Sequence, residues 1–327
     1  MCTSIRFNDA VGNMFFGRNL DWECGYGEVP VLAPKGWQYQ WVFEDAAHHA
    51  LYNESTYSGP HSVLGIGIVA ENTPLYFDCM NEEGLAVAGL LFAGFAAYEQ
   101  SPVEGKINIA AYELPLWICR NFSTLEQVEH ALDKLAIVGK GIAGMEPSYL
   151  HWMVADKTGS LVIEYMADGI HVHRNTVDVL ANQPSFDWHL ENLRSYYMVS
   201  PEVPASCTWG NAELSAYGTG AGMRALPGDY YSSSRFVRAA YLNAHYPAVE
   251  SEAENATRLF RTLQGVAMIE GASRMKNGNF EKTIYTSGYS AATGTCYFST
   301  YEDFALQHCS FADFDLNGTQ LVQKASS

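Results

Sequence analysis

The chain has 327 residues, of which 48% are hydrophobic and 17% are charged, so it is long enough to bury a large core. A formal net charge of −17 argues against non-specific binding to nucleic acid or to anionic membranes, and the field repels anionic ligands. No apolar run reaches the roughly eighteen residues that a membrane-spanning helix needs.

Cysteine usage indicates the compartment. Seven cysteines are scattered along the chain and none forms a Cys-x-x-Cys pair. Because nothing resembling a signal peptide precedes Cys2, we expect reduced thiols and a cytoplasmic location. His171 and His173 share one face of a strand, but no acidic or cysteine cluster at metal spacing accompanies them, so neither a metal nor another cofactor is expected.

The first part of the chain reads as strands. A hairpin joined by a turn over residues 9–12 is followed by a loop-rich stretch, a strand of alternating aromatics and a surface loop. Gly84 suits the left-handed turn between the last two of these strands. The strands are expected at 2–8, 13–19, 37–43, 63–69, 75–80 and 85–92, and the loops at 20–36 and 44–60.

The pattern then becomes helical, returns to strands and becomes helical again. Ser123 opens a capping box, Ser234 can cap a later helix, and residues 200–229 form a long segment rich in glycine and proline. Helices are expected at 107–120, 123–135, 186–198, 235–244 and 252–263, and strands at 151–155, 161–165, 170–173, 283–287, 296–300 and 304–308.

Clusters of strands alternating with clusters of helices predict an α+β fold. Two antiparallel sheets facing each other, with helices outside, would accommodate this order as a four-layer αββα sandwich. No internal repeat, low-complexity tract or linker marks a boundary, so we expect one domain over residues 1–327.

The cysteine at position 2 can have unusual reactivity. If Met1 is removed, Cys2 presents a thiol and a free α-amine on one residue. The amine has a reference pKa of about 7.7–8.0, so part of it is a base at neutral pH, and a thiol near pKa 8.5 is a ready nucleophile. We therefore expect an N-terminal nucleophile that supplies its own base. The plainer alternative is a small residue buried near a chain end.

Charged residues follow at a useful distance from Cys2. Arg18 can favour the thiolate, and Asp21 can hold the α-amine by a charge-assisted hydrogen bond. No Gly-x-Ser-x-Gly elbow occurs, which disfavours the serine hydrolase class.

Several short blocks, weak singly, acquire meaning from their order and spacing between residue 1 and about residue 300. They are Met1-Cys2-Thr3, Gly17-Arg18-Asn19-Leu20-Asp21, Asn81-Glu82-Glu83-Gly84-Leu85, Leu150-His151-Trp152-Met153, Asn182-Gln183-Pro184-Ser185-Phe186-Asp187-Trp188, Leu226-Pro227-Gly228-Asp229 and Ser234-Arg235-Phe236. Together they resemble the choloylglycine hydrolase family, which contains bile salt hydrolases and penicillin V acylases, and most closely its bile salt hydrolases of the bifidobacterial kind.

The resemblance implies the αββα fold of N-terminal nucleophile hydrolases and a set of site residues. Asn182 stands at the family's oxyanion-stabilising position, although an Asn before X-Pro is ordinarily a turn residue. Arg235 is the second family arginine, with a structural pair to Asp229 as the alternative. Many relatives carry Asn where this chain has Leu91, so we expect the Leu91 amide to complete the oxyanion hole. Asn81 is interpreted as a structural turn residue.

The expected function is deconjugation of bile salts by attack of Cys2 on the amide to glycine or taurine. The alternatives are a penicillin V acylase, an acylase of N-acyl homoserine lactones, and a non-catalytic binding protein of the same fold. The segment 200–222 resembles the assembly loop of tetrameric members, so we expect a homotetramer. Apolar positions that match the family's substrate pocket are Leu20, Trp22, Ala70, Phe77, Leu91, Phe92 and Ile142.

Overall fold

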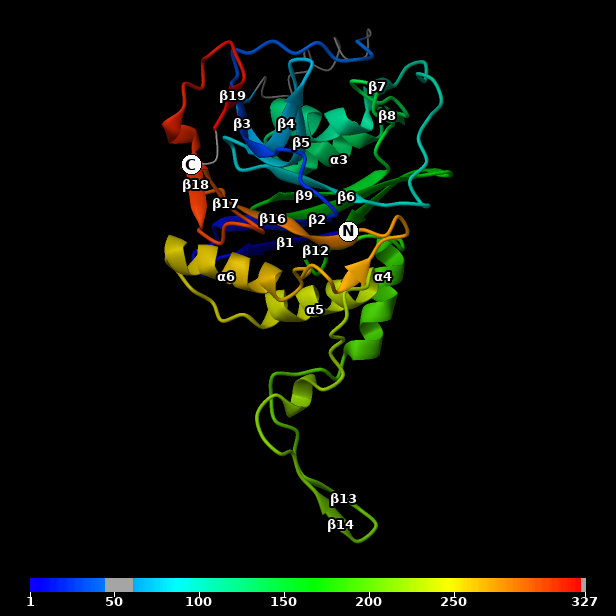
Figure 1. Ribbon diagram of the computed structural model, residues 1–327, viewed down its shortest axis with the longest axis vertical. Helices are drawn as coiled ribbons and strands as arrows, with labels where there is room; N and C mark the ends of the chain where they lie inside the picture. Colours follow the sequence, from blue (N-terminus) through cyan, green and yellow to red (C-terminus); the bar gives the residue numbers. More distant parts are fainter. Residues whose placement is uncertain (45–60, 325–327) are drawn as a thin grey trace.

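The computed structural model describes residues 1–44 and 61–324. Within them, two large antiparallel sheets lie face to face, and helices cover the outer face of each sheet (Figure 1). The α+β class and the αββα arrangement predicted from the sequence are confirmed. No helix in the described part of the chain is long and apolar enough to cross a membrane.

The first sheet carries Cys2 at the start of one of its strands. Cys2 lies opposite Leu20 of the neighbouring strand, and the segment at Val179 pairs on the other side of the Cys2 strand. In spatial order the strands are β12 (Val179–Leu180), β1 (Cys2–Asn8), β2 (Met14–Trp22), β16 (Phe280–Ser290), β17 (Thr295–Thr300) and β18 (Gln307–Ser310), with β15 (Ser273–Arg274) beside β16.

The second sheet faces β1 and β2 across the main hydrophobic core. Its strands in spatial order are β11 (Gly169–Arg174), β10 (Gly159–Met166), β9 (Leu150–Asp156), β6 (Ala86–Leu91), β5 (Thr73–Asn81), β4 (Val63–Ala70), β3 (Val29–Ala33) and β19 (Val322–Gln323). A short parallel pair, β7 (Ile107–Ala110) and β8 (Leu135–Val138), lies beyond its outer face (Figure 1).

The outer layers are helical (Figure 1). The second sheet is covered by α2 (Leu114–Asn121) and α3 (Leu125–Leu132), and the first by α4 (Phe186–Leu193), α5 (Ser232–His245) and α6 (Glu252–Gln264). Short 3-10 helices occur at Ala111–Glu113, Arg194–Tyr196, Ala221–Met223 and Phe311–Asp313.

Local sequence signals explain the hairpin and the close approach of α6. The Asp9 carboxylate accepts from the Val11 and Asn13 amides, at 2.9 and 2.7 Å, and fixes the turn between β1 and β2. Gly17 of β2 pairs with Gly288 of β16, directly under Leu259 of α6. A Cβ at Gly288 would lie 2.3 Å from the Leu259 side chain, so glycine there lets the helix pack on the sheet.

A thin projection extends away from the sandwich (Figure 1). We call residues 200–225 the arm. It contains the short strands β13 (Cys207–Trp209) and β14 (Ala212–Leu214), and every residue from 201 to 215 is exposed. The amide of Ser200 donates to the carbonyl of Gly222 at 3.1 Å, which closes the arm at its root.

Some local predictions were wrong. The aromatic alternation over residues 37–43 does not form a strand. Trp37 and Trp41 are instead buried in the second core, and Tyr39 packs between them and donates to Glu113 at 2.6 Å. Packing of the aromatic rings and the hydrogen bond to Glu113 therefore hold this stretch in place, although its alternating pattern alone predicted a strand paired in a sheet.

Other boundaries moved. The segment 29–33, predicted as loop, is β3, and the helix predicted from residue 107 begins only at Leu114 because Ile107–Ala110 pairs as β7. The helix predicted over 123–135 ends at Leu132, α4 ends at Leu193, and the last strand is shifted to 307–310. Residues 45–60 of the predicted surface loop lie outside the described residues.

Candidate active site

The site begins at the N-terminal end of β1. Cys2 is 4% exposed, and Met1 extends the strand beside Asp21 through reciprocal backbone hydrogen bonds of 2.6 and 2.8 Å. The Met1 ammonium also forms an ion pair with the buried carboxylate of Glu281 on β16. While Met1 is present the Cys2 nitrogen is an amide, which cannot act as a base.

Arg235 of α5 fixes the backbone around Cys2. Its guanidinium is fully buried and donates to the Cys2 carbonyl, to Thr3 Oγ1 at 2.6 Å and to Asn182 Oδ1 at 2.7 Å. Burial lowers the pKa of Arg235, while the charges of Asp21 and Cys2 act in the opposite direction. Asp229, the structural partner considered from the sequence, instead accepts from Ser234 and from the Tyr231 amide.

Asn182 lies two residues after the end of β12 and bridges the two sheets. Its Oδ1 accepts from the Cys2 nitrogen at 2.7 Å, and its Nδ2 donates to the Leu91 carbonyl of β6 at 2.7 Å. Its backbone is held by Ser232, which accepts from the amide at 3.0 Å, and by His189, whose Nε2 donates to the carbonyl at 2.8 Å. The side chain therefore has a defined orientation beside Cys2.

His189 keeps this segment in place as a neutral ring. The ring is fully buried against Phe236, and its Nδ1 has no hydrogen-bond partner among the described residues. Burial lowers the pKa of His189 to about 4. With Nε2 donating to the Asn182 carbonyl, a second proton on Nδ1 would place an unpaired charge in the core.

Asp21 occupies the helix-facing side of β2. Its Oδ1 accepts from the Thr283 hydroxyl at 2.6 Å, and its Oδ2 lacks a hydrogen-bond partner within the described chain. Arg235 Nη1 lies 3.9 Å from this second oxygen. A buried carboxylate oxygen with spare accepting capacity suits a nearby ammonium group.

Arg18 lies on the opposite face of β2 from Asp21. The guanidinium is fully buried, donates to the Phe77 carbonyl at 3.1 Å and lies 3.8 Å from Asp78 Oδ2. Burial alone would lower the pKa of Arg18, but the neighbouring charges, those of Cys2 and Tyr285 first, raise it above its ordinary value. The guanidinium is thus a permanent positive charge in the electrostatic neighbourhood of the thiol.

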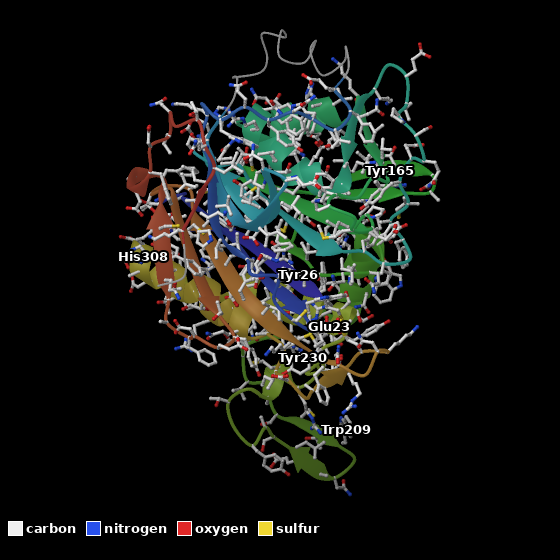
Figure 2. All side chains as sticks on the ribbon, turned by 45° about the horizontal axis from the view of Figure 1, so that its top comes forward. Glu23, Tyr26, Tyr165, Trp209, Tyr230 and His308 are labelled. Atoms are coloured by element: carbon white, nitrogen blue, oxygen red, sulfur yellow. The ribbon has the colours of Figure 1, made fainter. Side chains whose placement is uncertain are left out.

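A cavity of about 300 Å³ opens beside Cys2 and has mostly apolar walls. Tyr26, on the segment that follows β2, is labelled in Figure 2 and stacks obliquely against Phe77 with ring centroids 5.6 Å apart. The lining residues are Met1, Cys2, Leu20, Asp21, Trp22, Tyr26, Tyr76, Phe77, Gly89, Leu91, Pro147, Ser148, Tyr149 and Leu150.

The predicted pocket residues divide into two groups. Leu20, Trp22, Phe77 and Leu91 line this cavity. In the part of the chain that the structure describes, the lining does not include Ala70, Phe92 or Ile142. Phe92 belongs to the second core and stacks on His151 at 4.3 Å, Ala70 ends β4, and Ile142 follows β8.

The structure also locates Asn81 and the histidine pair, which were not assigned to the site from the sequence. Asn81 accepts from the Glu83 and Leu85 amides at 3.1 and 2.9 Å, so its predicted role as a turn residue is confirmed. His171 pairs with Asp168, and His173 lies 3.2 Å from Asp187. No group of three potential metal ligands is found among the described residues.

Sequence reasoning missed the residues that hold the others in place. Thr283, Ser232 and His189 have no motif of their own. Thr283 and Ser232 each act through a hydrogen bond to a residue far away in the chain, and His189 acts through one to Asn182. Tyr149 and Pro147 line the cavity but lie outside the sequence blocks that resemble the family. The next residues, Leu150 and His151, do belong to one of these blocks.

The arrangement can support acyl transfer. A thiol, a backbone nitrogen that would become an amine after loss of Met1, an amide side chain and buried arginines surround one apolar cavity. These are a nucleophile, a base, an oxyanion donor and charges that hold them in place.

Comparison with known proteins agrees with this chemistry. Residues 2–324 match the family model described as linear amide C-N hydrolases, choloylglycine hydrolase family. The chain is 47% identical to a bile salt hydrolase/transferase of Bifidobacterium longum subsp. longum, over 99% of this chain and 100% of that protein. It is 39% identical to a conjugated bile acid hydrolase of Lactobacillus gasseri, over 98% and 99% of the two chains.

Solved structures show the same architecture. The C2A mutant of the conjugated bile acid hydrolase from Clostridium perfringens superposes with a TM-score of 0.89 at 32% identity, covering 100% of this chain and 97% of the other. A penicillin V acylase from Agrobacterium tumefaciens shares the fold with a TM-score of 0.75 at 18% identity, covering 98% and 90% of the two chains.

Proposed function

Because the chain belongs to the choloylglycine hydrolase family of linear amide C-N hydrolases, we propose that it cleaves the amide joining a bile acid to glycine or taurine. The observation that carries the proposal is the position of Cys2 in the wall of an apolar cavity, with its nitrogen 2.7 Å from Asn182 Oδ1. The names of the relatives that span nearly the whole chain support this substrate class.

Maturation comes first in the proposed mechanism. Loss of Met1 turns the Cys2 amide nitrogen into an α-amine that can take the thiol proton. Asn182 Oδ1 already lies at hydrogen-bond distance from this nitrogen. Asp21 Oδ2, which has no hydrogen-bond partner among the described residues, lies among the same buried polar groups. The ammonium that forms would therefore find acceptors without rearrangement.

In the acylation step the Cys2 thiolate attacks the amide carbonyl, forming an S–C bond and a tetrahedral oxyanion. Asn182 Nδ2 has a second hydrogen beyond the one it gives to Leu91, and it donates that hydrogen to the oxyanion, with the Leu91 amide as the second donor. The C–N bond then breaks, and the Cys2 ammonium gives its proton to the departing amine of glycine or taurine.

Deacylation reverses the roles. Water attacks the thioester after the α-amine has removed one of its protons, and the S–C bond breaks. The products are the free bile acid and the regenerated thiol. Arg18 and Arg235 place a positive charge on each side of the Cys2 strand, paired with Asp78 and Asp21 at 3.8 and 3.9 Å. Because carboxylates match these charges, capture of an anionic substrate by a chain of net charge −17 relies on the apolar walls of the cavity and not on long-range attraction.

The cavity walls suit a rigid apolar body. Leu20, Trp22, Phe77 and Tyr26 provide aromatic and aliphatic surface, and burying apolar surface contributes about 25 cal/mol per Å². Because Met1 itself lines the cavity, its removal would also enlarge the space next to the thiol.

Turnover of glycocholate, taurocholate, penicillin V and an N-acyl homoserine lactone by the purified enzyme tests the proposal. We expect release of glycine or taurine, followed by mass spectrometry, to exceed cleavage of the other two substrates. Equal or faster cleavage of penicillin V would contradict the bile-salt assignment. A protein with no activity on any of them, although Met1 is removed and Cys2 reacts with a thiol reagent, would be a binding protein.

Homotetrameric assembly is proposed on the basis of the arm. Trp209 is 75% exposed and Tyr217 is completely exposed, and apolar surface of this kind is costly to leave in water. Trp209 is labelled at the far end of the molecule in Figure 2. A cytoplasmic location is proposed as well, because a thiol nucleophile and further free cysteines suit a reducing compartment. Light scattering and cell fractionation test these two points.

A further inference from the structure

A buried carboxylate lies between the two sheets on the cavity side of β2. Asp78 of β5 is 0% exposed, and its oxygens accept hydrogen bonds from hydroxyl groups on β16 of the opposite sheet. Within the described residues the donors are Tyr285 at 2.5 Å, Ser287 at 2.7 Å and Tyr289 at 2.6 Å. The carboxylate therefore links strands of different sheets.

The same carboxylate is the counter-ion of Arg18. Asp78 Oδ2 lies 3.8 Å from Arg18 Nη1, and this is the one ion pair of Arg18 within the described chain. The hydrogen bonds of the guanidinium are to backbone carbonyls, of Phe77 at 3.1 Å and Asn19 at 3.2 Å, and Nη2 has no hydrogen-bond partner among the described residues. The guanidinium also lies 6.0 Å from the centroid of the Tyr285 ring. Neutral carbonyls alone hold a buried cation less firmly than a carboxylate does.

The neighbours of Asp78 are those expected of a carboxylate. Burial raises the pKa of Asp78 above its usual value, and the charge of Arg18 and the hydroxyl donors limit that rise. Its oxygens accept from several hydroxyls at once, which is the role of a carboxylate and not of a carboxylic acid.

We infer that Asp78 is a positioning residue of the reaction: it holds the Arg18 guanidinium where its charge favours the Cys2 thiolate. The inference rests on the proposed cysteine nucleophile. Asp78 does not line the cavity and so does not meet the substrate. The hydroxyls of β16 in turn fix Asp78, so the second sheet and β16 together determine where the positive charge lies.

Two possible roles for Asp78 predict opposite changes in the pKa of the Cys2 thiol when the charge of Asp78 is removed. If Asp78 holds Arg18 in place, loss of its charge lets the guanidinium move away, and the pKa of the Cys2 thiol rises. If Arg18 stays fixed without it, loss of a nearby negative charge makes the thiolate easier to form, and that pKa falls. The other charged groups near the thiol, Asp21, Arg235 and Glu281, are unchanged in both cases.

The test is the pH dependence of Cys2 alkylation by iodoacetamide in the full-length enzyme lacking Met1, read on the N-terminal peptide by mass spectrometry. In Asp78→Asn we expect the apparent pKa of Cys2 to rise by about one unit or more and kcat/KM at neutral pH to fall at least roughly tenfold. An unchanged or lower pKa in the folded variant overturns the inference.

A matched control removes a buried carboxylate elsewhere. Glu113 is also buried and accepts from the Tyr39 hydroxyl at 2.6 Å, but it lies in the second core on the far side of the second sheet. Glu113→Gln should lower the melting temperature and leave the alkylation profile unchanged. If Asp78 were only a link between the sheets, Asp78→Asn would behave in the same way.

A second comparison covers the case in which Asp78→Asn does not fold. Arg18→Gln with Asp78→Asn leaves no unpaired charge in the core, so this double variant has less cost on folding. Loss of Arg18 removes the positive charge that Asp78 positions, so the double variant should have a Cys2 pKa above that of the wild type and no higher than that of Arg18→Gln, in which the negative charge of Asp78 remains. A Cys2 pKa in the double variant at or below that of the wild type overturns the inference. Failure of the proposed function is distinguishable, since inactive wild-type enzyme would still give an alkylation profile.

Discussion

The surroundings of Cys2 and the arm differ in every physical respect. Around Cys2, Arg235, Asn182 and Asp21 are almost completely buried, and their polar atoms are shared among residues of β1, β2, α5 and the segment after β12. In the arm, residues 201–215 are all exposed and apolar side chains such as Trp209 face solvent.

The difference indicates how each region obtains its order. Buried groups with interlocking partners are held by the rest of the fold, so the site can be rigid in one isolated subunit. The arm has few partners of its own, and its apolar residues gain stabilisation only against another surface. Substitutions around Cys2 should therefore change catalysis and leave assembly intact, and substitutions in the arm should do the reverse.

The largest effect is expected at the nucleophile. Cys2→Ala removes the thiol and leaves the buried network of Arg235 in place, so hydrolysis of glycocholate should fall by at least about 10⁴-fold while the fold is retained. Released glycine and the circular dichroism melting curve are the measurements. More than about one per cent of the wild-type rate would contradict a Cys2 nucleophile.

Asn182→Ala should follow in size. It removes a donor to the oxyanion together with the contacts to Cys2 and Arg235, so we expect kcat to fall about 10²–10³-fold. Asn81→Ala is the matched control, because Asn81 is also buried but binds only turn and helix backbone. If both variants lost the same activity per unit of lost stability, Asn182 would be a structural residue.

The buried ring behind Asn182 should make stability depend on pH. The folded chain keeps His189 neutral down to about pH 4, whereas the unfolded chain takes up a proton near pH 6.5. The free energy of unfolding should therefore fall as the pH drops from about 6.5 to 4, by up to about 3 kcal/mol. Denaturation of the wild type and of His189→Gln across this range checks it, and equal slopes would exclude His189 as the source.

A smaller effect is expected at the rim of the site. Leu91→Asn adds a side-chain donor where the backbone is proposed to donate already, so kcat should change by less than about tenfold. The Leu91 carbonyl, which accepts from Asn182, is untouched by the substitution. A hundredfold rise in kcat, measured with glycocholate, would show that the backbone amide does not complete the oxyanion hole.

The arm variant should change assembly and leave chemistry alone. Trp209→Ser with Tyr217→Ser should reduce the mass in light scattering from that of a tetramer, with kcat within about twofold of wild type because neither residue lines the cavity. Val11→Ser, at an exposed turn, serves as control. An unchanged mass would mean that the arm does not hold the subunits together.

Much of the fold follows from local signals in the sequence. The turn at Asp9 and the left-handed Gly84, with φ of 86°, are short-range features, and the predicted elements around them are confirmed. The predicted helix caps were wrong, because Thr124 and not Ser123 caps α3, and Ser234 lies inside α5. The strand predicted over residues 37–43 was wrong because tertiary contacts of Trp37 and Tyr39 replaced the sheet pairing that the period indicated.

The site was predictable only in part. Cys2, Arg18 and Asp21 lie close in sequence and on paired strands, so their proximity follows from one hairpin. Asn182 and Arg235 came from the family resemblance alone. Asp78 and Thr283 were missed, because a carboxylate or a hydroxyl within a strand carries no signal of the partner that it meets across the fold. The catalytic roles themselves stay predictions until the variants are measured.

The pairing of the first strand has a consequence for synthesis. The Cys2 nitrogen meets Asn182, 180 positions later in the chain, and β2 pairs with β16, which begins only at Phe280. At about 5–20 residues per second, a ribosome needs roughly ten to forty seconds to reach Asn182 after Cys2 has left the peptidyl-transferase centre. Throughout that interval the nascent Cys2 thiol has neither its oxyanion donor, Asn182, nor its second arginine, Arg235. The nucleophile is therefore synthesised first, and the residues that make it catalytically competent are synthesised much later.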